Sequence, residues 1–151
     1  MLSNPRPRVL CVEDDEDSRM MLVTLLELEL IEVQAVGTAA QALSLMQTER
    51  FDLYLLDGWL PGLDGFELCR RVRAFDPLTP ILFFSGAAYE SDRKRGIEAG
   101  SNAYLVKPNV NELVGSIRRL VSEAESVTAK VIPFRRKMSF SSPFTFEPAA
   151  A

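Results

Sequence analysis

Five short apolar runs, separated by segments of helical spacing, constrain the fold of this chain more than any other feature of its sequence. The runs are RVLCVED (8–14), IEVQAV (31–36), FDLYLLD (51–57), TPILFFSG (79–86) and NAYLVKP (102–108). Their length and their content of aliphatic and aromatic residues are typical of strands. We therefore predict a strand in each run and a helix after each strand.

The segments between the runs carry the signals with which helices begin. Three pairs have or approximate capping-box spacing: Thr38 with Gln41, Asp64 with Glu67, and Asn109 with Glu112. The last segment repeats apolar residues at the spacing of one helix face: Val110, Leu113, Val114, Ile117, Leu120 and Val121. Strands that alternate with helices favour a parallel sheet covered by helices on both faces. The predicted fold class is doubly wound α/β with a five-stranded parallel sheet.

Composition narrows the class of protein. The 151 residues suit a single domain, and their net charge of -4, with no basic run before residue 123, does not favour direct binding to nucleic acid. The N-terminus has no signal-peptide pattern, and no apolar run is long enough to span a membrane, so we expect a cytoplasmic protein without membrane contact. The sequence contains no His. This excludes a Ser-His or Cys-His nucleophile pair and a His metal cluster within these residues.

Several apolar positions are predicted to be core. Cys11 and Cys69 lie far apart in apolar patterns without a CxxC pair, and we expect buried, reduced thiols. The neighbouring pairs Phe83–Phe84 and Met20–Met21 are also assigned to the core. Buried residues of this kind pack and carry no chemistry.

Polar side chains stand where the predicted strands end. Glu13 and Asp14 end the first run, Asp57 the third, Ser85 the fourth and Lys107 the fifth. Open parallel sheets bind ligands at the carboxyl ends of their strands, so these groups should converge. Carboxylates that converge without Arg repel one another unless a cation lies among them. Oxygen ligands without His or thiolate favour Mg²⁺, with Mn²⁺ as the alternative.

Four motifs in this order resemble the receiver domain of two-component response regulators: VEDDEDSR, LLDGWLPGLDG, FFSG and YLVKP. The resemblance covers residues 8–121. It implies a flavodoxin-like fold with strand order 2-1-3-4-5. It also implies that Asp57 is the phosphoacceptor, and that Glu13, Asp14, Asp57 and the backbone carbonyl of Trp59 bind Mg²⁺.

The same resemblance assigns the remaining site residues. Ser85 would contact the phosphoryl group, Lys107 would pair with it, and Ser85 and Tyr104 would form a conformational switch. The peptide bond between Lys107 and Pro108 should be cis. Each residue also has a plainer interpretation, because a strand-end Asp often caps a helix and a Ser-Gly pair is ordinary turn chemistry.

The predicted function is that of a stand-alone response regulator. A histidine kinase or histidine phosphotransfer protein would phosphorylate Asp57, and an unknown downstream protein would receive the signal by contact. Activity would be limited to self-phosphorylation from a phosphodonor and autodephosphorylation. The main alternative is a pseudo-receiver that is never phosphorylated. A haloacid dehalogenase phosphatase would need a second acid where Trp59 stands, and a flavin-binding protein would need a Ser/Thr-rich loop in place of the acids after the first strand.

The receiver domain is assigned to residues 1–123 and a tail or linker without an output domain to residues 124–151. This segment has no sustained period and is rich in Ser, Pro and Phe. This segment contains Phe140, Phe144 and Phe146, which would dock on the domain or on a second copy of the chain. The sequence does not decide the role of residues 139–146 or whether the chain forms a homodimer.

Overall fold

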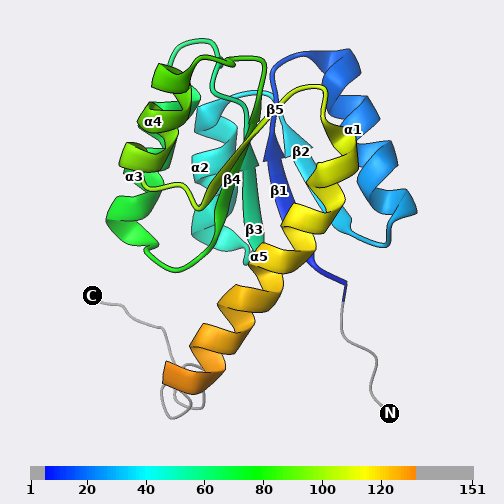
Figure 1. The fold of residues 1–151 in the computed structure, drawn as a ribbon, viewed down its shortest axis with the longest axis vertical. Helices are drawn as coiled ribbons and strands as arrows, with labels where there is room; N and C mark the ends of the chain where they lie inside the picture. The colour runs from blue at the N-terminus through cyan, green and yellow to red at the C-terminus, as the bar shows by residue number, and fades with distance from the viewer. Residues whose placement is uncertain (1–5, 132–151) are drawn as a thin grey trace. The chain divides into compact units, whose positions relative to one another are not determined.

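The computed structural model describes residues 6–131 and shows alternating strands and helices (Figure 1). The elements are β1 (Arg8–Val12), α1 (Glu16–Leu28), β2 (Glu32–Val36), α2 (Ala39–Thr48), β3 (Leu53–Leu56), α3 (Gly65–Phe75), β4 (Ile81–Ser85), α4 (Glu90–Ala99), β5 (Ala103–Val106) and α5 (Val110–Val131). All pairings are parallel, and the strand order is β2-β1-β3-β4-β5. The predicted fold class and strand order are confirmed.

The strand register brings the carboxyl ends of four strands to one edge of the sheet. Val12 of β1 pairs with Leu56 of β3, and Leu56 in turn pairs with Phe83 of β4. Ser85 of β4 pairs with Val106 of β5. Residues that follow these strands, although far apart in sequence, therefore meet at this edge.

Side-chain caps fix where three helices begin. Thr38 accepts a hydrogen bond from the backbone of Gln41, and Asp64 accepts one from the backbone of Glu67, as their spacing predicts. Asp15 caps α1 by accepting from the backbone of Ser18 at 2.9 Å. Such caps satisfy backbone donors that have no partner inside the helix. They also hold the loops that leave β1, β2 and β3.

Two apolar clusters cover the faces of the sheet. Phe83 belongs to the cluster with α2 and α3, and Phe84 to the cluster with α1 and α5. Adjacent residues on a strand point to opposite faces of the sheet. Because helices cover both faces, both rings are buried, as expected. Cys11 and Cys69 are buried free thiols. No helix within residues 6–131 is long and apolar enough to cross a membrane.

The structure corrects one expectation and adds to another. Met20 and Met21 are 61% and 49% exposed, because the buried stripe of α1 runs through Leu22 and Leu26. Helix α5 continues to Val131, so the first residues of the segment assigned to the tail or linker are helical, while that assignment itself stays a prediction. This stretch has no Gly or Pro before Pro133 and contains Ala, Glu and Lys, which are good helix formers. The Phe-rich stretch 139–146 lies outside the described residues.

Candidate functional site

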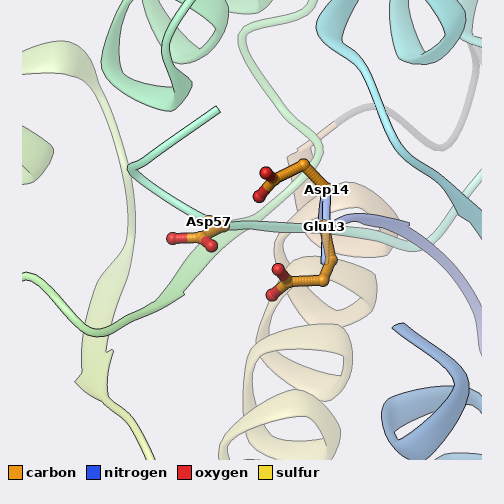
Figure 2. Close-up of side chains that lie close together, drawn as sticks. All are labelled: Glu13, Asp14 and Asp57. Atoms are coloured by element: carbon orange, nitrogen blue, oxygen red, sulfur yellow. The ribbon is translucent and has the colours of Figure 1, made fainter. Parts of the chain in front are cut away.

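Three carboxylates meet beyond the ends of β1 and β3. Glu13 and Asp14 follow β1 directly, Asp57 follows β3, and one oxygen of each lies within 4.8 Å of the others. Figure 2 shows the three side chains extending to the same side of the strand ends. Glu13 and Asp57 are buried, whereas Asp14 is exposed. The predicted convergence of these acids is therefore present in the structure.

Lys107 joins the two buried acids. Its Nζ donates to Oε1 of Glu13 at 2.6 Å and to Oδ2 of Asp57 at 3.3 Å. Burial disfavours the ammonium, but the hydrogen bond to Glu13 and the nearby carboxylates outweigh burial, and the pKa of Lys107 is raised. Burial raises the pKa of Glu13, although Lys107 opposes this effect. The site holds more negative charge than one lysine can balance.

The loop after Asp57 is shaped by glycine. The backbone N–H of Trp59 donates to Oδ1 of Asp57 at 3.1 Å, and Gly65 at the start of α3 donates to the carbonyl of Gly58 at 3.0 Å. A Cβ on Gly65 would lie 2.0 Å from the carbonyl oxygen of Asp57. Gly62 has a φ of 75°, a backbone conformation that L side chains rarely adopt. Only glycine lets the chain turn this tightly around Asp57.

Ser85 and Tyr104 meet at the backbone of one residue. Oγ of Ser85 accepts from the N–H of Ala87 at 3.2 Å, and the Tyr104 hydroxyl donates to the carbonyl of Ala87 at 2.7 Å. Ser85 also lies beside the loop of Asp57, since its Oγ would be 3.2 Å from a Cβ on Gly58. Both side chains are buried, and burial raises the pKa of Tyr104. The structure thus brings the two expected switch residues together.

The remaining predicted positions lie close by. Trp59 is 56% exposed, and its backbone, as described above, contacts Asp57. The peptide bond between Lys107 and Pro108 is cis, the configuration expected for it. The N–H of Lys107 donates to the carbonyl of Ser85 at 2.9 Å, which ties the end of β5 to that of β4.

Arg19 is a site residue that sequence reasoning missed. From α1, its Nη1 donates to the carbonyl oxygens of Glu13 at 2.9 Å and Asp14 at 3.3 Å. The same nitrogen would lie 3.2 Å from a Cβ on Gly37, so a larger residue there would crowd it. In the sequence, an Arg in the first turns of a helix looks like an ordinary surface charge, so nothing signals that its side chain extends to these carbonyl oxygens. These hydrogen bonds hold the backbone of Glu13 and Asp14 in place.

The donor set fits a hard divalent cation. All three side chains offer carboxylate oxygens, which suit Mg²⁺ and Mn²⁺ better than softer metals. Cys11 lies in the adjoining strand, but burial raises the pKa of its thiol to about 12, so it is not a thiolate ligand. A cation would also relieve the repulsion among the acids.

Comparison with known proteins identifies response regulators among the relatives of this chain. The family model of the response regulator receiver domain matches residues 9–118. The DNA-binding response regulator MtrA of Mycolicibacterium smegmatis is 34% identical over 128 residues, which are 84% of this chain and 56% of that protein. The chain spans about half of the length of the curated relatives it matches.

Solved structures agree in fold. A CheY-like receiver domain protein from Methanospirillum hungatei has a TM-score of 0.75 at 30% identity, over 80% of this chain and 98% of that chain. The receiver domain of sensor histidine kinase PA1611 from Pseudomonas aeruginosa has a TM-score of 0.72 at 30% identity, over 78% of this chain and 98% of that chain. Magnesium is coordinated in the active-site cleft of the PA1611 domain.

Proposed function

The chain belongs to the response regulator receiver domain family, and on this premise we propose that Asp57 accepts a phosphoryl group in a Mg²⁺-dependent reaction. The observation that carries the proposal is the contact of Lys107 with both Asp57 and Glu13. It places one fixed cation beside the candidate nucleophile in a partly buried site. A solvated strand-end Asp would need no such partner.

The chemistry follows from the charges at the site. An oxygen of Asp57 attacks phosphorus, a P–O bond forms, and the bond from phosphorus to the donor breaks and leaves its electrons on the donor. No general base is needed, because a carboxylate nucleophile carries no proton. Lys107 neutralises charge on the transferred oxygens, and Ser85 orients one of them. The product is an acyl phosphate on Asp57.

Glu13, Asp14, Asp57 and the carbonyl of Trp59 would hold the Mg²⁺. When bound, this ion supplies positive charge that stabilises the transferring phosphoryl oxygens. The buried acids and Arg19 keep the backbone of this loop fixed for that purpose. Mg²⁺ keeps several waters in such sites, which agrees with the exposure of Asp14.

The donor and the recipient of the signal are other proteins. A histidine phosphodonor must lie outside these 151 residues, because they contain no His. We assign that role to a histidine kinase or histidine phosphotransfer protein. Ser85 and Tyr104 then pass the change to a binding surface. Stand-alone action by protein contact and a cytoplasmic location stay predictions. The absence of nucleic-acid contact also stays a prediction, since MtrA is by name a DNA-binding regulator.

Intact mass spectrometry tests the proposal. Incubation with Mg²⁺ and acetyl phosphate should add one phosphoryl mass to the native chain. Asp57→Asn should remove the addition, because an amide is not a nucleophile here. Asp17→Asn, on the exposed first turn of α1, is the matched control and should keep it. An unchanged mass of the native chain at high donor concentration would refute the proposal and favour the pseudo-receiver.

A further inference from the structure

Three aromatic rings form a continuous row through the core on the α3 and α4 side of the sheet. They come from three elements: Phe66 from α3, Phe83 from β4 and Tyr104 from β5. The ring centroids of Phe66 and Phe83 are 5.1 Å apart, and those of Phe83 and Tyr104 are 5.5 Å apart. Phe66 and Phe83 are fully buried and Tyr104 is 6% exposed. We name these three residues the aromatic row.

One end of the aromatic row presses on the loop of the phosphoacceptor. Gly58 follows Asp57 directly, and a Cβ on Gly58 would lie 3.0 Å from two ring atoms of Phe66. No room is left between this loop and the ring. A backbone shift at Asp57 and Gly58 must therefore be met by movement of Phe66, because a packed interior has few voids to absorb it.

Helix α4 touches the aromatic row at both ends and in the middle. The guanidinium of Arg95 lies 4.2 Å above the ring centre of Phe66, and that of Arg93 lies 5.8 Å from the ring centre of Tyr104. A Cβ on Gly96 would lie 2.8 Å from Cδ2 of Tyr104 and 3.3 Å from Cδ2 of Phe83. In Figure 1, α4 lies beside α3 at one side of the sheet. The position of α4 is thus set by the same three rings.

We propose that Phe66 and Phe83 are positioning residues that couple the Asp57 loop to helix α4 through ring packing, in parallel with the contact of Ser85 and Tyr104 at Ala87. The coupling rests on the proposed phosphorylation of Asp57, and it adds a route for the signal that needs no hydroxyl group. Packed rings have discrete arrangements, so a small shift at Gly58 can move the row from one arrangement to another.

Amide hydrogen exchange of α4 measures the coupling in the native chain. Exchange is compared with and without Mg²⁺ and acetyl phosphate, and each difference is scaled by the phosphorylated fraction from intact mass. Phe66→Leu and Phe83→Leu should each reduce the scaled difference in α4 at least about twofold. Phe84→Leu is the matched control, because it removes an equally buried ring from the neighbouring position on the other face of the sheet. It should keep the native difference.

A purely structural role gives a different result. Loss of packing alone would speed exchange in both states and leave the scaled difference unchanged. A full response of α4 in both Phe66→Leu and Phe83→Leu would therefore overturn the coupling.

A second perturbation needs no phosphodonor. Gly58→Ala places a methyl group against Phe66, and it should change α4 exchange in the unphosphorylated chain. Phe66→Leu leaves space for the methyl group, so in the Gly58→Ala, Phe66→Leu double variant the change should shrink to the part that comes from Ser85, whose Oγ would lie 3.2 Å from the same methyl group. If the native chain gains no phosphoryl mass, the proposed function fails, and this arm still decides the coupling. A change of the same size in the single and the double variant would overturn it.

Discussion

The carboxyl group of Glu13 stands between one ammonium and two other carboxylates. Burial raises its pKa above the ordinary value, so the folded chain holds this proton more tightly than the unfolded chain. For an acid with a raised pKa, ionisation costs folding stability. This loss of folding stability is absent below the pKa that the group has in the unfolded chain. It grows as pH rises through the higher pKa that the group has in the folded chain. The group therefore makes the chain less stable towards neutral pH.

Glu13→Gln should for this reason raise the free energy of unfolding more at about pH 7.5 than at about pH 4, because the cost of ionising this buried carboxyl group falls as pH falls. Urea unfolding in the absence of divalent cations measures both values. Glu98→Gln on the exposed face of α4 is the control for the substitution of a carboxyl group by an amide. Equal effects of Glu13→Gln at the two pH values would contradict a burial cost at this carboxyl group.

The role of a single residue was predictable where a charged residue type stands at the end of a predicted strand. Asp57, Glu13 and Lys107 each stand at the end of an apolar run, and the structure brings them into contact. Arg19 was not predictable, because it contacts the backbone carbonyls of Glu13 and Asp14, and a helix Arg carries no sequence signal for a backbone contact. The aromatic row was also hidden, since its rings come from three separate elements.

The start of α3 is the element on which the shape of the Asp57 loop depends most. Gly65 is its first residue and packs against the carbonyl of Asp57. Gly65→Ala should lower the free energy of unfolding by about 1–3 kcal/mol, as overpacking of a tight site does. It should also slow phosphorylation, because the loop must shift. Urea unfolding and intact mass measure the two effects.

Gly115 provides the matched control for that substitution. It lies inside α5, and a Cβ there would meet nothing within 4 Å. Gly115→Ala should raise the free energy of unfolding by about 0.5–1 kcal/mol, since Gly is less favourable than Ala in a helix. Equal effects of the two substitutions would show that contact with the Asp57 carbonyl does not limit residue 65.

Element boundaries were predictable where caps or glycines mark them. Thr38 and Asp64 start their helices as expected. The end of α5 was not marked by the apolar stripe, which stops at Val121 while helix-forming residues continue to Val131. The prediction that Met20 and Met21 belong to the core was wrong. Adjacent residues of a helix face different directions, and the buried side of α1 is the one that carries Leu22 and Leu26.

At the scale of the whole receiver domain, the site exists only when the sheet is assembled. Glu13 and Asp14 follow β1 and Asp57 follows β3, so the unfolded chain does not hold their carboxylates together. The alternation of strands and helices was sufficient to predict this edge. What sequence could not give is the balance of charge there, because it depends on the burial of Glu13 and Asp57 and on which oxygens Lys107 reaches.

Mg²⁺ should therefore stabilise the whole domain. A ligand that binds only the folded chain raises the free energy of unfolding by about 1.4 kcal/mol at about tenfold its Kd. Thermal unfolding should shift upward as Mg²⁺ is added, and the emission of Trp59, the single tryptophan, should change over the same concentration range. Asp14→Ala should weaken both responses, whereas Asp17→Ala, at an exposed position in the first turn of α1, should keep them. An unchanged midpoint in Asp14→Ala would place the cation elsewhere and separate the acid cluster from Mg²⁺ binding.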